Sequence, residues 1–362
     1  MIFHAPYPLN PNATSASGIR PVRMLEAFRA AGFEVLTVTG SARERRVAMK
    51  QIEADVRNGK KIDFLYSEAS TRPLTFSTSF RQPHPYLDTA FFRFCQRHDI
   101  PVGVFYRDIY WQFSDYVDAV GRPAAAVLRR AYRHELKGYR SSVSALYLPS
   151  MKMADSIPFI DRDRCIALPP GSESVESPAP DNELNILYVG GVGSYYRMHE
   201  AVIAVERTPD TSLIICTRES EWQAQAHSYE PHLEDSVTVV HESGAGLERL
   251  YGLISVGSLI VEPIGYREFA APLKMYEYLG HGKPIIATTG TLAAEFVTSN
   301  GIGWAVDYNA EALAALFERL AAHPNEVAEK TARAREVRQQ HTWLARALQV
   351  RDDLTAQKAK QR

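Results

Sequence analysis

The chain has 362 residues, more than one typical hydrophobic core needs and enough for two domains. Hydrophobic residues make up 45%, charged residues 23%, and the formal net charge is -1, which is typical of a soluble globular protein and lacks the basic excess of a nucleic-acid binder. No apolar run approaches the ~20 residues that span a bilayer, and residues 1–8 lack the charged start and apolar core of a signal peptide. We therefore expect a cytoplasmic protein that binds no nucleic acid.

Short apolar runs alternate with amphipathic stretches through the first half of the chain, a pattern that predicts a parallel α/β sheet. The expected strands are 2–5, 35–39, 64–66, 102–106 and 145–148. Between 169 and 183 the composition changes to four prolines with almost no large apolar residue. This segment is the predicted linker.

A second α/β series follows the linker. Its expected strands are 186–189, 212–216, 237–240, 259–261 and 285–288. The predicted fold class is α/β, with two Rossmann-like parallel-sheet domains at 1–168 and 184–340 that face one cleft.

The segment 268–288 combines a helix start, charged side chains at helical spacing, a helix stop and a buried strand. Pro272 suits the first helical position, and two glycines end the same helix. Lys274, Glu277 and Tyr278 then share one face of it. A helix N-terminus with a lysine in its first turn is typical of an anion site.

This segment resembles the nucleotide-sugar signature of GT-B glycosyltransferases, especially the retaining family 4 group, whose pattern ends in Glu-Tyr/Ala-Leu/Met-x-x-Gly-Lys-Pro-Val-Ile-Ala. The resemblance implies that Glu277 binds the ribose hydroxyls of the donor nucleotide and that Lys274 lies near its diphosphate. It places Glu268, a catalytic candidate, near the donor sugar with the amides of Phe269 and Ala270. Eight residues separate Glu268 from Glu277, where the family usually has seven.

The resemblance covers most of the chain and implies that its two halves bind different substrates. Residues 1–168 form the acceptor-side domain and 184–340 the domain that binds the nucleotide sugar. The terminal stretch 341–362, with Trp343 near its start, is expected to be a helix that crosses back to the first domain. The implied activity is transfer of a sugar to an acceptor hydroxyl with retention, in the synthesis of surface glycans or glycoconjugates.

A glycine turn follows the predicted strand 186–189. Gly191 and Gly193 let backbone amides approach a phosphate, but the dinucleotide pattern fails because its third glycine is absent. In the resembling family this turn binds the donor diphosphate, with a basic residue after it that would be Arg197 here. Arg218, at the end of the next strand, is a second candidate cation. The alternative is a structural turn with solvated arginines.

The first strand leads into a loop of small residues before a helix. Ser17 and Gly18 lie at the helix start, where a phosphate or an acceptor group would bind. The family has a glycine loop at this place, although this one has a single glycine. A flexible surface loop is the alternative.

Arg107 and Asp108 follow the predicted strand 102–106, where family members often carry a His-Asp pair that faces the reacting sugar. Arginine cannot act as a base because its pKa is too high. Asp108 is therefore the candidate to orient the acceptor hydroxyl or to accept its proton. Its alternative role is to cap the following turn.

No metal site is expected. Asp161 and Asp163 form a DxD, the signature with which the other large glycosyltransferase fold holds a metal, but they lie in a charged connection and predict a turn. The cysteines have no metal-ligand spacing and predict buried thiols: Cys95, Cys165 and Cys216. We expect no cofactor besides the donor substrate.

The stretch 124–140 predicts an amphipathic helix with a basic outer face. Its apolar stripe is Leu128, Tyr132, Leu136 and Tyr139. Its basic residues are Arg129, Arg130, Arg133, Lys137 and Arg140. Such a face either contacts anionic lipid headgroups weakly, at the inner face of a membrane, or is simply solvated.

The sequence leaves more than one class of function open. The leading interpretation is a metal-independent transferase whose partners are a nucleotide-sugar donor and a glycan, lipid-linked or small-molecule acceptor. The first alternative is a non-catalytic GT-B subunit that binds nucleotide or glycan for a partner transferase. The second is a nucleotide-sugar epimerase or hydrolase of the same fold.

Overall fold

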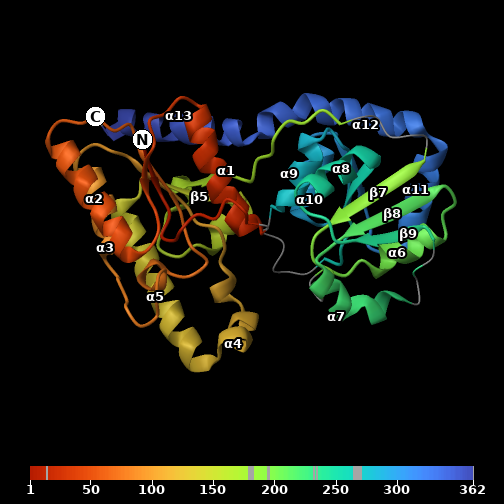
Figure 1. The fold of residues 1–362 in the computed structure, drawn as a ribbon, viewed down its shortest axis with the longest axis horizontal. Coiled ribbons are helices and arrows are strands. Elements are labelled where there is room, and N and C mark those ends of the chain that lie inside the picture. The colour runs from red at the N-terminus through yellow and green to blue at the C-terminus, as the bar shows by residue number, and fades with distance from the viewer. Residues whose placement is uncertain are drawn as a thin grey trace. The chain divides into compact units, whose positions relative to one another are not determined.

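The computed structural model describes residues 1–13, 15–177, 183–193, 196–230, 233, 235–263 and 271–361. The chain divides into two compact units (Figure 1): unit 1 is Met1–Pro170 with Trp343–Arg362, and unit 2 is Gly171–Thr342. Each unit contains one six-stranded parallel sheet, so the predicted α/β class with two parallel sheets is confirmed.

The sheet of unit 1 has the order β2-β1-β3-β4-β5-β6. Its strands are β1 (Ile2–His4), β2 (Leu36–Val38), β3 (Leu65–Glu68), β4 (Val102–Phe105), β5 (Ala145–Leu148) and β6 (Cys165–Ala167). Only β6 was not among the expected strands. The order of the strands reverses between β1 and β3, which is where doubly wound folds place their ligands.

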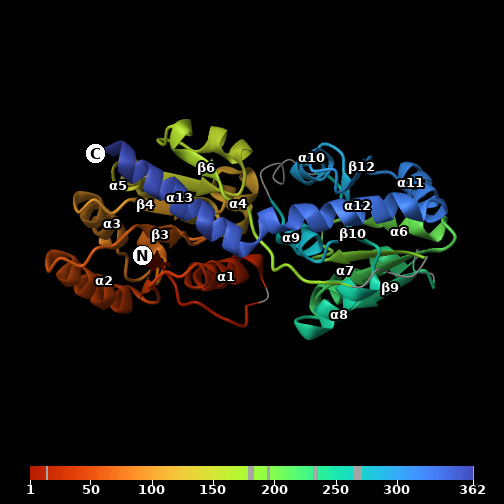
Figure 2. The same ribbon diagram turned by 90° about the horizontal axis from the view of Figure 1, so that it is seen from above.

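Helices cover both faces of this sheet. They are α1 (Ala16–Ala30), α2 (Ala42–Arg57), α3 (Leu87–Arg97), α4 (Ser114–Val120), α5 (Arg122–Ser142) and α13 (Trp343–Gln361), with short 3-10 turns η1 (Leu74–Phe76), η2 (Tyr110–Gln112), η3 (Met151–Ser156) and η4 (Arg162–Arg164). The terminal helix α13 lies beside α1 (Figure 2). A β-carbon on Gly103 of β4 would lie 3.1 Å from Leu354 of α13, so this helix packs closely on the sheet.

The sheet of unit 2 has the order β12-β11-β10-β7-β8-β9. Its strands are β7 (Leu184–Val189), β8 (Thr211–Cys216), β9 (Val237–Val240), β10 (Val256–Leu259), β11 (Ile285–Thr288) and β12 (Gly303–Val306). β12 was not predicted, and β10 begins earlier than expected because Gly257 and Ser258 interrupt its apolar pattern. Gly257 faces the ring of Tyr278, and a β-carbon there would lie 2.4 Å from that ring.

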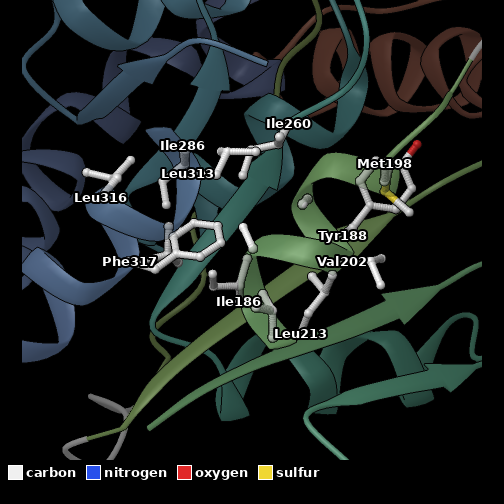
Figure 3. Packing of buried hydrophobic residues seen from close by; sticks show 14 of the residues in the cluster. Ile186, Tyr188, Met198, Val202, Leu213, Ile260, Ile286, Leu313, Leu316 and Phe317 are labelled. Carbon is white, nitrogen blue, oxygen red and sulfur yellow. The ribbon is translucent and has the colours of Figure 1, made fainter. Parts of the chain in front are cut away.

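The core of unit 2 lies on both faces of its sheet. The helices are α6 (His199–Glu206), α7 (Glu219–Tyr229), α8 (Ala245–Leu253), α9 (Leu273–Gly280), α10 (Leu292–Ser299), α11 (Ala310–Ala322) and α12 (Pro324–Val337), followed by the 3-10 turn η7 (Arg338–His341). Figure 3 shows Ile186 and Tyr188 of β7 in one cluster with Phe317 of α11. Leu187, between them, packs into the opposite cluster with Leu279 of α9. β7 is therefore buried on both sides, as parallel central strands usually are.

The first boundary between the units lies after Pro170, inside the predicted linker 169–183. Residues 171–177 pack on unit 2, where the amide of Val175 donates to the carbonyl of Gly280 at 3.0 Å. Arg338 donates to the carbonyl of Val175 at 2.8 Å. These backbone contacts compensate for the lack of apolar side chains in the segment.

A buried polar network ties four elements of unit 1 together. Nε2 of His4 lies 2.9 Å from Asp88, and Nδ1 lies 2.7 Å from the hydroxyl of Ser67. Burial lowers the pKa of His4, so the ring is neutral, donates to Asp88 and accepts from Ser67. Arg45 donates to both oxygens of Asp88, at 2.9 and 3.1 Å. All four side chains are buried, so the network stabilises the fold and is closed to ligands.

Two further sequence expectations concern cysteines and membranes. The three cysteines are buried and free of disulfide bonds, as predicted. Among the helices that the structure describes, none is long and apolar enough to cross a membrane.

Candidate functional site

The turn after β7 lies where the strand order of unit 2 reverses. β8 follows on one side of β7 and β10 lies on the other. Ligands of doubly wound folds bind beyond the carboxyl ends of the strands at such a point. The turn starts at Gly190, whose φ of 141° favours glycine. The predicted residues Gly191 and Gly193 follow it, so the glycine turn occupies the expected ligand position.

Lys274, in the first turn of α9, reaches this glycine turn. Its Nζ lies 3.7 Å from the ring centroid of Tyr188 and 5.4 Å from that of Tyr196. A β-carbon built on Gly190 would lie 3.1 Å from the same nitrogen, which shows how closely the lysine approaches the backbone. The structure therefore brings the predicted lysine and the predicted turn together. A cation beside backbone amides at a helix N-terminus is suited to a diphosphate.

Glu277 lies nearly one helical turn after Lys274. Its carboxylate accepts a hydrogen bond from the hydroxyl of Tyr251 in α8, at 3.3 Å. Burial, followed by the charge of Glu277, raises the pKa of Tyr251 well above its ordinary value, so this hydroxyl remains a donor. Sequence reasoning missed Tyr251, since it lies 26 residues from Glu277. The predicted residues Glu268, Phe269 and Ala270 lie outside the described residues.

Tyr278 fixes α9 to the sheet. Its side chain was expected on the face of Lys274 and Glu277, and it is fully buried. The hydroxyl accepts from the amide of Val189 and donates to the carbonyl of Leu187, both at 3.0 Å. Because these are the last residues of β7, the tyrosine sets the position of α9 relative to the glycine turn.

The two predicted arginines are exposed, and each has an acidic partner. Arg197 lies 3.4 Å from Glu262. Arg218 is the N-cap residue of α7 and donates to Glu221 at 2.5 Å. A β-carbon on Gly191 would lie 2.7 Å from the other oxygen of Glu221, so this carboxylate covers the glycine turn. Because a guanidinium has five N–H donors, an acidic partner does not by itself prevent either arginine from contacting a phosphate.

A second candidate site is a cavity of about 320 Å³ in unit 1. The predicted residues Ser17 and Gly18 line it at the start of α1, together with Tyr7 and Arg107. Arg107 donates to the carbonyl of Ser17 at 3.1 Å and to the hydroxyl of Tyr7 at 2.8 Å. A β-carbon on Gly18 would lie 2.5 Å from Ala13, so the loop needs glycine there.

A buried carboxylate lies behind this cavity. Glu68, the last residue of β3, accepts from Arg20 at 3.1 Å and from Tyr66 at 2.6 Å. Its other oxygen lies 3.8 Å from Arg107. Sequence reasoning missed Glu68 and Arg20, although a glutamate at the end of a buried strand is a usable signal.

Asp108 does not line the cavity. One of its oxygens accepts the amide of Tyr110 at 3.2 Å, the local bond of a capping aspartate. Burial raises the pKa of Asp108. The structure thus separates Asp108 from its neighbour Arg107, which faces Tyr7 and Ser17.

The DxD aspartates lie at η4, where Asp161 precedes the turn and Asp163 is inside it. Both are exposed. Within the described ranges, no group of three or more His, Cys, Asp or Glu side chains is arranged to hold a metal ion.

Helix α5 has the amphipathic pattern predicted for 124–140. The whole apolar stripe is buried: Leu128, Tyr132, Leu136 and Tyr139. Glu135 is buried too and accepts from the hydroxyl of Tyr139 at 2.7 Å, so it does not neutralise the outer face. Arg129 is half-buried and donates to backbone carbonyls. Of the predicted basic residues, the exposed ones are Arg130, Arg133, Lys137 and Arg140.

Comparison with known proteins finds a family match in unit 2. Residues 172–338 match the family model described as glycosyl transferases group 1. The glycine turn, Lys274 and Glu277 all lie inside this match. No curated protein sequence matches the chain.

Solved structures share the fold of the whole chain. Sucrose-phosphate synthase from Thermosynechococcus elongatus has a TM-score of 0.67 at 16% identity, over 100% of this chain and 99% of that one. HepE from Anabaena, solved with UDP-glucose, gives 0.64 at 11%, over 98% and 99%. WaaG, a glycosyltransferase involved in lipopolysaccharide biosynthesis, gives 0.61 at 13%, over 98% and 100%. At these identities the likeness shows the fold, which is GT-B.

Proposed function

We propose that the protein is a glycosyltransferase that moves a sugar from a nucleotide-sugar donor to an acceptor hydroxyl, with retention at the anomeric carbon. The observation that carries the proposal is the approach of Lys274 to the glycine turn after β7, with Glu277 nearly one helical turn further on. These groups offer a cation for a diphosphate and a carboxylate for a ribose. HepE was solved with UDP-glucose, which supports a UDP-sugar as the first donor to test.

The proposed roles follow from the chemistry of the leaving group. The bond between the anomeric carbon and the diphosphate breaks, a bond to the acceptor oxygen forms, and the acceptor hydroxyl loses its proton. Lys274 and the N-terminus of α9 would stabilise the charge that develops on the diphosphate. We propose Glu268, with the amides of Phe269 and Ala270, for the donor sugar. Asp108 stays the candidate for the acceptor hydroxyl, although it accepts from the amide of Tyr110 and does not line the cavity of unit 1. Arg197 and Arg218 are candidate phosphate ligands.

The experiment incubates the full chain with a panel of nucleotide sugars and mixed acceptors, with and without excess chelator. We expect acceptor-dependent release of nucleoside diphosphate that survives the chelator, because Lys274 already supplies a cation near the glycine turn. Activity that a chelator abolishes and magnesium or manganese restores would contradict metal independence. Release without acceptor would indicate a hydrolase, and an altered nucleotide sugar without release would indicate an epimerase.

A non-catalytic subunit is the second candidate. The observation that favours it is Arg107, which stands where family members often carry a histidine and cannot act as a base. In the same assay a non-catalytic subunit would bind nucleotide without turnover.

We propose that the transferase acts in the cytoplasm, in the synthesis of a polysaccharide or another surface glycan.

We also propose weak peripheral membrane contact through the outer face of α5. Each basic residue near an anionic membrane contributes about 1 kcal/mol, and the buried stripe leaves only electrostatic attraction. We expect more protein to sediment with anionic than with neutral vesicles at low salt, and the excess to vanish at high salt.

Replacing three exposed residues of α5 by glutamine, namely Arg130, Arg133 and Lys137, should remove the vesicle binding. The matched control neutralises three exposed residues of α2, namely Arg43, Arg46 and Lys50. Equal loss in both variants would show that α5 has no special role. Equal sedimentation with anionic and neutral vesicles would rule out the contact itself.

A further inference from the structure

We propose that the cavity of unit 1 binds a small molecule with a phosphate or carboxylate group, and that Arg107 receives this group. The proposal rests on the proposed function only in identifying the molecule as the sugar acceptor. All the described residues that line the cavity belong to unit 1.

Arg107 presents a fixed guanidinium to the cavity. Its hydrogen bonds to Ser17 and Tyr7 hold the group in place, and within the described residues these occupy two of its five N–H donors. An arginine that is already ordered loses little entropy when it binds an anion, and its planar donors match carboxylate and phosphate oxygens.

The carboxylates near Arg107 do not line the cavity. Arg20 and Arg107 share the buried carboxylate of Glu68, and the charge of Arg107 also acts on Asp108, which accepts from the amide of Tyr110. Among the described residues that line the cavity, Arg107 is the charged one. An anionic ligand there meets a cation and no acidic side chain of these residues, in a partly buried setting where electrostatic attraction is weakly screened.

The cavity also offers hydrogen-bond donors. Because Arg107 donates to the oxygen of Tyr7, the hydroxyl hydrogen of Tyr7 is directed elsewhere and can serve a ligand. Burial raises the pKa of Tyr7 to about 12, so it stays protonated at neutral pH. The start of α1 adds partial positive charge at Ser17. A volume of about 320 Å³ is near the lower end of the ~300–1,000 Å³ of small-molecule sites, which suits one sugar unit with its charged group.

Calorimetric titration of the full chain in phosphate-free buffer tests the site with three probes: glucose 6-phosphate, glucuronate and glucose. We expect at least one anionic probe to bind about 10-fold to 100-fold more tightly than glucose, and the better of the two identifies phosphate or carboxylate. Arg107→Gln should remove this preference, because a hydrogen bond to a charged group is lost. Arg43→Gln, at an exposed arginine of α2, is the matched control and should keep it.

Several outcomes overturn the proposal. The first is equal binding of all three probes, and the second is no binding of either anionic probe. The third is a preference for the anionic probe that Lys274→Gln removes while Arg107→Gln retains it. Tyr7→Phe keeps the ring and removes the hydroxyl, so it should weaken the binding of the anionic probe severalfold. This variant decides the question if Arg107→Gln does not fold. Nucleotides titrated in parallel, with UDP first, test unit 2. Nucleotide binding without anionic-probe binding contradicts this inference alone, whereas the absence of binding to every nucleotide tested contradicts the proposed function.

Discussion

Replacing Asp88 by alanine is expected to lower the free energy of unfolding by about 3–5 kcal/mol, the cost of removing one member of a buried ion pair. Asp88 accepts from Arg45 and His4, and all three side chains are fully buried. The variant leaves the guanidinium of Arg45 without its carboxylate, away from water. Chemical denaturation, with hydrogen exchange of β1 and β3 to localise the loss, measures the effect.

The control for this prediction is a surface ion pair in the same unit, in which Arg57 is exposed and Glu53 is half-buried. Glu53→Ala breaks a bond with Arg57 of 3.2 Å on the surface of α2 and should cost less than about 1 kcal/mol. If Asp88→Ala costs no more than Glu53→Ala, the buried network has no special role in stability.

The contribution of Asp88 should depend on pH with a definite sign. Burial alone would raise its pKa, but the hydrogen bond from His4 and the charge of Arg45 outweigh burial, and the folded-state pKa is lowered. A carboxylate with a lowered pKa stabilises the fold above its ordinary unfolded-state pKa and loses this effect as the pH falls through the folded-state value. The stabilities of wild type and variant should therefore converge only in strong acid.

Replacing Lys274 by methionine is expected to reduce kcat/KM about 10²- to 10³-fold, because the leaving diphosphate loses a preorganised positive charge. Methionine keeps the length and the apolar contact with Tyr188, so the fold should persist. Release of nucleoside diphosphate at varied donor concentration measures the effect.

The matched control for Lys274→Met is Arg207→Met, which removes an exposed cation of the same unit. It should leave kcat/KM unchanged. An active Lys274→Met variant would show that the diphosphate binds elsewhere, even if the protein proves to be a transferase.

Local sequence patterns predicted those parts of the fold in which each element carries its own signal. The glycine turn after β7 and the start of α9 were both expected as anion-binding features, yet only the structure shows Nζ of Lys274 at the ring of Tyr188. Periodicity identifies the face of a helix but does not say which loop that face meets.

Some contacts of the candidate site were not predicted because they join residues far apart in the sequence. Arg20 and Glu68 are separated by 48 positions, and no spacing rule connects them. The start of strand β10 was predicted too late for a different reason. Gly257 interrupts the apolar pattern of the strand, and a side chain at this position would collide with the ring of Tyr278. Such a contact has no trace in the local pattern of hydrophobic residues.

Titration of the full chain with UDP and UDP-glucose tests the central claim, a nucleotide site in unit 2, most directly. The account predicts saturable binding that Glu277→Gln weakens about 10-fold or more, because a hydrogen bond to a charged carboxylate is worth about 1.5–3 kcal/mol. Glu318→Gln, at an exposed glutamate of α11, should bind like the wild type. Equal affinity of Glu277→Gln and wild type for every nucleotide tested would contradict the account.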